Sequence, residues 1–308
     1  MNFDPAELAA RLALVADGEV KTHMPLAPYT SYRIGGPSAV WVAPETESGV
    51  GRVLEIIHAL PVPLFILGRG SNVLISDQGW QGVTLYLGRN FTGWRFAGRT
   101  AKVQAGTRLE DLIRTAVAKG LAGLEQLAGI PGGIGGALRM NAGAFGREIE
   151  KVTVAVRGFR RDGSPVAVSP QEIGFGYRCA PGLEDVVITS ADFGFDPAEA
   201  SALRVRMNAI LNLRAQKQPI DYPSCGSVFK RPSGYFAGAL IEEAGLKGAT
   251  IGGAMVSPQH AGFILNVDNA SAADVYALMR RIEHKVWERF GVELEREVKL
   301  IGAFDEDP

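Results

Sequence analysis

The sequence predicts an α+β protein, because segments with the apolar density of strands are mixed with segments of helical spacing. Residues 64–67 and 186–195 read as buried strands. Residues 271–290 carry apolar side chains at helical spacing and form the strongest predicted helix of the chain. The closing stretch 292–302 alternates apolar and charged residues, which is typical of a half-buried strand.

The first two thirds of the chain are predicted as a mixed region of helices and strands. Asp4 followed by Pro5 is typical of a helix N-cap and the first helical position. The further elements are a strand at 38–44, a helix at 50–60, strands at 64–67, 73–76 and 83–87, a helix at 108–119, and strands at 151–159, 165–168 and 186–195. The two strands that flank Asp162-Gly163 are predicted to form a hairpin, because this dipeptide favours a tight turn.

The last third is predicted to begin with a helix at 198–217, which we take as a domain boundary. A short strand around Ser227, a helix at 237–244 and a strand at 262–267 follow. Ser271 and Asp274 form a capping box at the start of the next helix. Gly291 is predicted to end that helix.

Composition and charge exclude several classes of protein. The chain has 308 residues, a length that suggests two domains, and its hydrophobic fraction of 46% excludes disorder over most of it. A formal net charge of −1 leaves no broad cationic field for nucleic acid or a membrane surface. Two cysteines are too few for a disulfide framework, and the N-terminus lacks the pattern of a signal peptide. The low cysteine count fits a reducing cytoplasm, where we expect the protein. No stretch of the sequence is predicted to cross a membrane.

Glycine-rich loops carry the strongest indication of a ligand. The chain contains 38 glycines, and dense runs of them occur at 67–72 and 129–143. Their backbone N–H groups, with Ser71 and Asn72 beside them, would form a concave site suited to a pyrophosphate. Neither run has the spacing of a P-loop or a Rossmann site, and the four histidines are too dispersed for a metal site. The alternative is that both runs are tight connections in a compact fold, and spacing alone leaves both interpretations open.

A second cluster of polar groups lies between residues 214 and 232. Its members are Arg214, Lys217, Ser227, Lys230 and Arg231. Such groups suit a phosphorylated or carboxylated substrate. From spacing alone a solvated helix end followed by a turn serine is the simpler interpretation. Arg178 is most simply an arginine stacked on Tyr177, and Glu297 is most simply a surface carboxylate.

Nine segments taken together resemble one enzyme family. They are YTSYRIGG at 29–36, LGRGSNVLISD at 67–77, GIPGGIGGALRMNAGAFG at 129–146, FGYR at 175–178, RAQKQP at 214–219, CGSVFKRP at 225–232, AGALIEEAGLKG at 237–248, HAGFILN at 260–266 and LEREVKLIG at 294–302. In this order they resemble the UDP-N-acetylenolpyruvoylglucosamine reductases, also called UDP-N-acetylmuramate dehydrogenases, of bacterial peptidoglycan synthesis. The short passage from 178 to 198 resembles the subclass that lacks an inserted tyrosine-bearing loop.

The resemblance implies the fold, the domains and the ligands. It implies a vanillyl-alcohol-oxidase-type FAD-binding region over 1–197, in two lobes of about 1–62 and 63–197. A substrate-binding α+β domain would follow over 198–308, and its last strand either stays with it or returns to the FAD-binding region. Non-covalent FAD, NADPH as co-substrate and UDP-N-acetylglucosamine enolpyruvate as substrate are implied. The resemblance implies no metal, no nucleic-acid partner and no membrane insertion.

The resemblance also implies a mechanism and the catalytic residues. NADPH reduces FAD and leaves, and the enolpyruvyl substrate then takes its place and receives the hydride. Ser227 matches the family's proton donor. Arg178 and Glu297 match the charged pair that stabilises the enolate-like intermediate. Because an ionised Glu297 would repel that intermediate, we expect it to act protonated or through a hydrogen-bonded network.

The same matches give the binding residues. Those implied for FAD are Gly68, Arg69, Gly70, Ser71, Asn72, Gly129, Pro131, Gly132, Gly135, Gly136, Asn141, Gly143 and Arg214. Those implied for the substrate are Tyr177, Lys217, His260 and Lys299. Arg231 departs from the asparagine common in the family, which affects one substrate contact. Cys225 is predicted on the same strand face as Ser227, but Ser227 holds the motif position.

Two other functions share parts of this pattern. An FAD-dependent oxidase or dehydrogenase of a hydroxy acid or sugar lactone would share the glycine loops. A catalytically silent flavin- or nucleotide-binding regulator would share the fold. The serine motif and the C-terminal glutamate favour the reductase over both.

Overall fold

The structure, a computed structural model, describes residues 3–304, and the chain divides into two compact units. Unit 1 comprises the residues up to 22, 40–69 and 82–214, and unit 2 comprises 23–39, 70–81 and the residues from 215 on. The last border therefore lies between Arg214 and Ala215, inside a helix. The sequence analysis places its border between 197 and 198.

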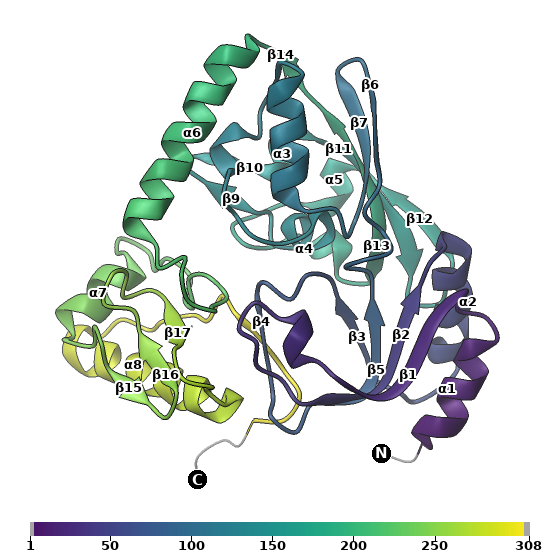
Figure 1. Ribbon diagram of the computed structural model, residues 1–308, viewed down its shortest axis with the longest axis horizontal. Helices are drawn as coiled ribbons and strands as arrows, with labels where there is room; N and C mark the ends of the chain where they lie inside the picture. Colours follow the sequence, from purple (N-terminus) through teal and green to yellow (C-terminus); the bar gives the residue numbers. More distant parts are fainter. Residues whose placement is uncertain (1–2, 305–308) are drawn as a thin grey trace. The chain divides into compact units, whose positions relative to one another are not determined.

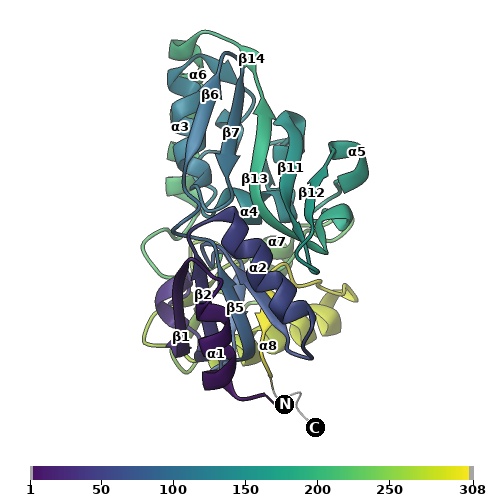
Figure 2. The same ribbon diagram turned by 90° about the vertical axis from the view of Figure 1, so that its right-hand side faces the viewer.

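The larger core of unit 1 is built on an antiparallel five-stranded sheet (Figure 1). Its strands, in sheet order, are β12 (Pro165–Val168), β11 (Thr153–Arg160), β13 (Val186–Gly194), β7 (Thr100–Gln104) and β6 (Trp94–Ala97). The helices of this part are α3 (Leu109–Ala118), α4 (Ile134–Arg139), α5 (Pro170–Ile173) and α6 (Ala200–Lys217). Helices α3 and α6 lie on one side of the sheet (Figure 2). Their apolar faces join its core, because Leu112, Ile113 and Leu203 are fully buried.

A second core of unit 1 forms where α1 (Pro5–Ala13) and α2 (Glu47–His58) pack on a four-stranded sheet. The strands of this sheet, in order, are β1 (Gly18–Pro25), β2 (Pro37–Pro44), β5 (Trp80–Tyr86) and β3 (Leu64–Leu67). As predicted, Asp4 caps α1, and its carboxylate accepts the Ala6 N–H at 2.8 Å. Two short antiparallel pairs complete the unit: β8 (Leu121–Ala122) with β14 (Asp196–Pro197), and β9 (Gly143–Ala144) with β10 (Arg147–Glu148).

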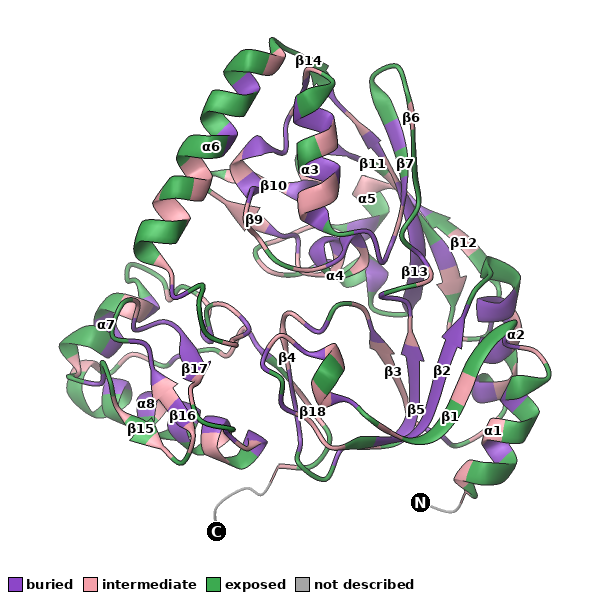
Figure 3. Ribbon diagram, in the orientation of Figure 1, coloured by how far each residue is buried: buried purple, intermediate pink, exposed green. Residues whose placement is uncertain are grey.

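Unit 2 contains an antiparallel sheet of three short strands. In sheet order they are β15 (Thr250–Ile251), β16 (Ala254–Val256) and β17 (Ile264–Asn266). The helices α7 (Ala237–Glu243) and α8 (Ala272–Phe290) share its core. The strand β4 (Val73–Ile75) pairs in parallel with β18 (Lys299–Ile301). Val275, Leu278 and Ile282 of α8 are buried. Figure 3 colours each described residue of the chain by its burial.

Several predicted elements are confirmed at their ends as well as in their type. The hairpin of β11 and β12 forms around Asp162-Gly163, as the turn residues predict. Helix α8 begins with the predicted capping box of Ser271 and Asp274. It ends at Gly291, which adopts φ +64°, a left-handed conformation that glycine reaches without steric cost.

The predicted closing strand is too long. Only 299–301 is a strand, and 292–298 lies outside any named strand. Arg296 forms an isolated antiparallel bridge with Phe229 and a two-pronged ion pair with Glu283 of α8. The predicted strand around Ser227 is reduced to an isolated bridge with Phe263, because the backbone turns at Gly226 with φ +82°.

Nine of the named strands and two of the helices between residues 3 and 304 were not predicted: β1, β6, β7, β8, β9, β10, β14, β15, β16, α4 and α5. The side chains of β1 are mostly exposed, so no apolar pattern marks it. The β6–β7 hairpin turns at Gly98-Arg99, a weaker turn signal than Asp-Gly. Helix α4 lies inside the second glycine run. It forms because Ile134, Ala137 and Leu138 are buried in the unit 1 core, which outweighs the poor helix propensity of Gly135 and Gly136. Within residues 3–304, no helix is both long and apolar enough to cross a membrane.

Candidate active site

The two glycine runs approach each other in unit 1. A Cβ placed on Gly133 would lie 3.4 Å from Cγ of Arg69. The Arg69 guanidinium donates to the Gly88 carbonyl at 3.3 Å. The Gly135 N–H donates to the Ala105 carbonyl at 2.8 Å, which ties the second run to the end of β7. The two runs therefore share one region of unit 1, with an arginine between them.

Two glycines of these runs border open space. Gly68 and Gly136 have no atom within 4 Å of the place where a Cβ would stand, and neither has a positive φ. Gly133 and Gly135, by contrast, have neighbours at 3.0 and 3.2 Å. At Gly68 and Gly136 neither the backbone conformation nor protein packing requires glycine. Glycine is also used where a ligand approaches the backbone closely, and this third reason fits both positions. These residues therefore fit a large phosphate-bearing cofactor such as FAD.

Exposure separates the predicted FAD-binding residues into two groups. Those at least partly exposed are Gly68, Arg69, Ser71, Asn72, Gly129, Pro131, Gly132, Gly135, Gly136, Gly143 and Arg214. Gly70 and Asn141 are buried. Gly70 has φ +61°, and a Cβ there would stand 2.2 Å from the backbone oxygen of Tyr29. Glycine at this position is therefore required by the protein's own backbone.

Arg214 brings a second positive charge to the glycine runs. Its side chain lies against Gly129, where a Cβ would come 2.8 Å from Cδ of Arg214. Its guanidinium lies 5.8 Å from the centre of the Phe145 ring. Burial lowers the pKa of Arg214, yet arginine remains charged at neutral pH. A partly buried guanidinium of this kind suits a phosphate, because it offers directed N–H donors and loses little hydration.

Asn141 and Gly143 hold the turn that carries Arg178. The Asn141 amide nitrogen donates to the Gly176 carbonyl and to the Glu150 carboxylate, both at 3.1 Å. The Arg178 guanidinium donates to the Gly143 carbonyl at 3.2 Å. Asn141 is fully buried, so it orders the backbone before Arg178 and offers no exposed atom to a ligand. This differs from the direct FAD contact that the sequence analysis expects of it.

Arg178 lies in a tight turn of unit 1. Gly176 and Cys179 exchange backbone hydrogen bonds of 3.0 and 3.3 Å across it. Arg178 itself has φ +55°, a conformation that costs a non-glycine residue energy and is concentrated at functional sites. Its guanidinium lies 5.1 Å from the centre of the Tyr177 ring, so the predicted stacking is present. Stacking uses the face of a guanidinium, whereas carboxylates bind at its N–H edge.

Ser227 and Glu297 lie on adjacent backbone segments of unit 2. The Glu297 N–H donates to the Val228 carbonyl at 2.8 Å. Val228 and Val298 are buried and anchor the two segments in the core. Ser227 is exposed and Glu297 is partly exposed, so both residues lie at the surface of unit 2. On its other side the Ser227 segment bridges to Phe263.

Three predicted substrate-binding residues lie in unit 2. Lys217 ends α6 and Lys299 begins β18, and both are exposed. His260 is partly buried, and its Nδ1 accepts the Gly262 N–H at 3.1 Å. Burial lowers the pKa of His260, so its imidazole is neutral at pH 7. In this state it offers a substrate hydrogen-bonding and packing contacts, not a positive charge.

Arg231, at the position where the motif departs, is held by aromatic neighbours. Its guanidinium lies 4.0 Å from the centre of the Phe236 ring, a cation–π contact. Its Nε donates to the Tyr235 carbonyl at 3.3 Å. Lys230 forms an ion pair with Glu295. These contacts within unit 2 fix both cations of the motif.

Comparison with known proteins identifies the family. A family model of the UDP-N-acetylenolpyruvoylglucosamine reductase C-terminal domain matches residues 218–301, and one of an FAD binding domain matches 37–169. A UDP-N-acetylenolpyruvoylglucosamine reductase of Pediococcus pentosaceus is 43% identical over 92% of this chain and 95% of its own. The chain belongs to the UDP-N-acetylenolpyruvoylglucosamine reductase family.

Two further members of the reductase family support this assignment. The protein of that name from Syntrophomonas wolfei is 40% identical over 92% of this chain and 95% of its own. The crystal structure of the Thermus caldophilus reductase (MurB) superimposes with a TM-score of 0.77 at 33% identity, covering 92% of this chain and 99% of that one. The predicted fold class, α+β with an FAD-binding region, is confirmed, as is the predicted flavoprotein oxidoreductase.

The structure corrects the predicted orientation of Cys225. Its side chain is 4% exposed, while Ser227 two residues later is exposed, because the turn at Gly226 breaks strand alternation. Burial raises the pKa of the Cys225 thiol to about 12. Cys225 is therefore a core residue without ready access to a ligand.

Thiol labelling tests this placement of Cys225. Because the thiolate is the reactive form, Cys225 should resist iodoacetamide at pH 8 in the folded protein. Cys179 is exposed and should react. We expect one label per folded chain, on Cys179, and two after denaturation. A label on Cys225 at a similar rate under native conditions would contradict its burial.

The sequence analysis missed the groups that anchor the glycine runs. The Gly88 and Ala105 carbonyls hold Arg69 and Gly135. The sequence signal for Gly88 was weak, a glycine directly after a predicted strand. The structure explains this glycine, because a Cβ there would stand 2.4 Å from the Gly68 oxygen. Ala105 has no signal, because a backbone carbonyl can come from any residue type. Among residues 3–304 no cluster of three potential metal ligands is present.

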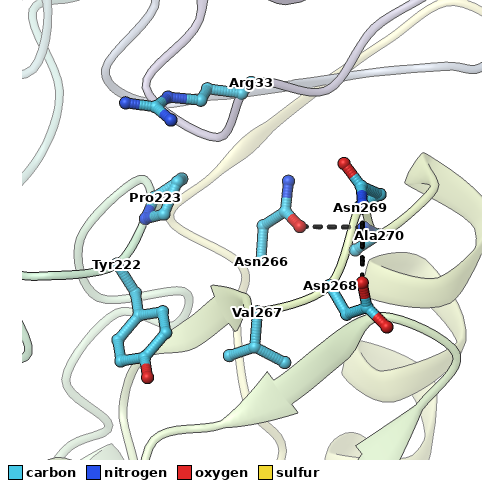
Figure 4. Close-up of a pocket in the computed structure, with 8 residues that line it drawn as sticks. All are labelled: Arg33, Tyr222, Pro223, Asn266, Val267, Asp268, Asn269 and Ala270. Carbon is cyan, nitrogen blue, oxygen red and sulfur yellow. Dashed lines mark hydrogen bonds between the residues drawn. The ribbon is translucent and has the colours of Figure 1, made fainter.

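Unit 2 also contains a pocket of about 380 Å³ that none of the predicted site residues lines (Figure 4). Its lining residues are Arg33, Tyr222, Pro223, Asn266, Val267, Asp268, Asn269 and Ala270. The Asn266 amide stabilises the fold, because it donates to the Tyr32 carbonyl at 2.9 Å and accepts the Ala270 N–H at 2.8 Å. We assign no ligand to this pocket.

Proposed function

We propose that the protein reduces UDP-N-acetylglucosamine enolpyruvate to UDP-N-acetylmuramate with NADPH through bound FAD, in cytoplasmic peptidoglycan precursor synthesis. The observation that carries the proposal is the 43% identity over 92% of the chain to a relative named for this reduction. The open glycine positions Gly68 and Gly136, with Arg69 and Arg214 beside their runs, support a site for FAD. The remainder, from 198 on, would then bind most of the substrate, in agreement with the C-terminal domain match.

Arg69, Arg214 and the glycine runs would hold the phosphates of FAD. The chemistry that FAD supplies when bound is hydride transfer from NADPH to the enolpyruvyl methylene carbon. The residues of this chain then have two tasks. They must orient the enolpyruvyl group, and they must complete the reduction with a proton at the neighbouring carbon, so that one hydride and one proton saturate the double bond.

Ser227 would deliver that proton from its Oγ. A serine hydroxyl is a weak acid, but the carbanion formed by hydride addition is a far stronger base, so placement matters more than acidity. The exposure of Ser227 supports this role. Its backbone is held in place, because Ser227 bridges to Phe263 and the next residue, Val228, accepts a hydrogen bond from the Glu297 N–H. A hydroxyl on a fixed backbone loses little conformational freedom on reaching the reactive carbon.

Arg178 and Glu297 would stabilise the charge that develops on the substrate. Negative charge moves into the substrate carboxylate as hydride adds, and a guanidinium edge can bind such a carboxylate with two hydrogen bonds. The strained turn of Arg178 supports this role, because its φ of +55° is retained against an energetic cost. Glu297 would serve in its protonated form, as a hydrogen-bond donor to the enolate oxygen.

Lys217, Lys299, His260 and Tyr177 would contact the UDP-sugar. Replacing Lys217 by alanine should raise KM for the UDP substrate more than KM for NADPH, with kcat little changed. A phosphate contact stabilises the bound substrate and the transition state alike, which is why the effect falls on KM. Steady-state kinetics with each substrate varied in turn measures this. Equal changes in both KM values would identify Lys217 as a structural residue.

A direct assay separates the proposal from the two alternatives. A purified reductase should oxidise NADPH in proportion to added UDP-N-acetylglucosamine enolpyruvate. A hydroxy-acid or lactone oxidase would not reduce this substrate, and its flavin would be reduced by an alcohol group of its own substrate. A silent flavin-binding regulator would bind FAD and turn over neither.

A further inference from the structure

We infer that Asn72 is a positioning residue for Glu297, an inference that rests on the proposed function of Glu297. The Asn72 side-chain nitrogen donates to the backbone carbonyl of Glu297 at 3.1 Å. The sequence analysis places Asn72 with the FAD-binding residues. The structure gives its amide a partner on the segment that carries a catalytic candidate.

The contact continues a parallel ladder by one rung. Strands β4 and β18 pair from Val73 and Lys299 onward, and the Lys299 N–H donates to the Asn72 carbonyl at 3.1 Å. Glu297 lies two residues before Lys299, ahead of the first pair of the ladder. The Asn72 amide donates to its carbonyl there, as asparagine side chains commonly do at the ends of regular structure. Glu297 is thereby attached to the end of the first glycine run.

Glu297 is held from its other side by the Ser227 segment. Its N–H donates to the Val228 carbonyl at 2.8 Å, next to the proposed proton donor. Both polar groups of the Glu297 backbone are thus bound, one to each of two segments that carry predicted site residues. The direction of the Glu297 side chain follows from this backbone. Loss of the Asn72 contact would leave the carbonyl of Glu297 without this donor and would loosen one of its two attachments.

The expected consequence is specific to one half-reaction. Glu297 acts on the enolpyruvyl group, so a shift in its position should slow reoxidation of the flavin by the substrate and spare flavin reduction by NADPH. We expect Asn72→Ala to reoxidise ~10- to 10²-fold more slowly, the scale on which small misplacements of catalytic groups act. Asn72→Asp keeps the size of the side chain but replaces the donor by an acceptor, so it should be at least as slow.

Asn90→Ala is the matched control. Asn90 is also a partly buried asparagine, and its amide also donates to backbone carbonyls, those of Ala43 at 3.2 Å and Pro44 at 3.1 Å. It has no part in the proposed site. We expect this variant to lose stability without slowing reoxidation, which separates positioning of Glu297 from general loosening of the fold.

Two measurements on each variant test the inference. Anaerobic stopped-flow absorbance gives the two half-reaction rates at known FAD occupancy, and hydrogen–deuterium exchange reports the 296–299 backbone independently of activity. Faster exchange there and slower reoxidation, in Asn72→Ala and not in Asn90→Ala, are the expected results. Wild-type reoxidation in Asn72→Ala, equal loss of both half-reactions through loss of FAD, tolerance of Asn72→Asp, or equal slowing in Asn90→Ala would each overturn it. If the wild-type protein itself fails to reduce the substrate, the proposed function fails instead.

Discussion

Replacing Ser227 by alanine should slow the reoxidation of reduced flavin by the enolpyruvyl substrate at least ~10²-fold, the lower end of what a positioned acid contributes. Reduction of the flavin by NADPH should stay near the wild-type rate, because the removed hydroxyl has no role in that step. Ser227 is exposed and its side chain is small, so the fold and FAD binding should survive. Anaerobic stopped-flow absorbance of the flavin separates the two steps.

Two further variants sharpen the Ser227 experiment. Ser227→Cys should recover part of the rate, because a thiol can also donate a proton. Cys225→Ala should keep the wild-type reoxidation rate, because that thiol is buried, and should lower stability by about 1 kcal/mol, the usual scale of a core substitution. If Ser227→Ala reoxidises normally and Cys225→Ala does not, the donor has been assigned to the wrong residue.

Replacing Gly136 by leucine should weaken FAD binding at least ~10-fold, which corresponds to about 1.4 kcal/mol. Nothing lies within 4 Å of a Cβ at this position, so the new side chain enters space that the protein leaves open. Gly136 lies in helix α4 without a positive φ, and leucine has the higher helix propensity, so the apo-protein should be at least as stable as the wild type. Flavin fluorescence titration and thermal unfolding of the apo-protein measure the two quantities.

The contrast with Gly70 shows why Gly136 is the better position for this test. A Cβ on Gly70 would stand 2.2 Å from the Tyr29 oxygen, and its φ is +61°. A larger residue there would strain the backbone and lower stability and flavin binding together. Gly136→Ala, with only a methyl group, should weaken FAD binding less than leucine does. Full FAD affinity in Gly136→Leu would remove the second glycine run from the cofactor site.

Elements with local signals are predictable from this sequence, and elements held by distant partners are not. Helix α8 carries its own start and stop in Ser271 and Gly291, and the β11–β12 hairpin carries its turn in Asp162-Gly163. The closing segment 292–302 is predicted as one long strand because apolar and charged residues alternate along it. Its actual course depends on Glu283 and Val228, which no local pattern of 292–302 contains.

The candidate site divides in the same way. Ser227, Arg178 and the glycine runs were found through the family motifs that contain them, because the spacing of these residues alone left a purely structural interpretation open. The positions that place them are backbone groups and buried side chains. Asn141 orders the turn of Arg178, and Asn72 donates to the Glu297 carbonyl, and the sequence marks neither backbone contact. The FAD contact expected of Asn72 stays a prediction. A side chain that bonds to backbone leaves no mark that distinguishes it from one that bonds to a ligand.

The most direct test of the proposed function is one anaerobic titration of the purified, FAD-loaded protein. The flavin is first reduced with one equivalent of NADPH, and UDP-N-acetylglucosamine enolpyruvate is then added. The proposal predicts full return of the oxidised flavin absorbance and one equivalent of UDP-N-acetylmuramate by mass spectrometry. Flavin that stays reduced after the substrate is added, or a protein that binds no FAD, would contradict it.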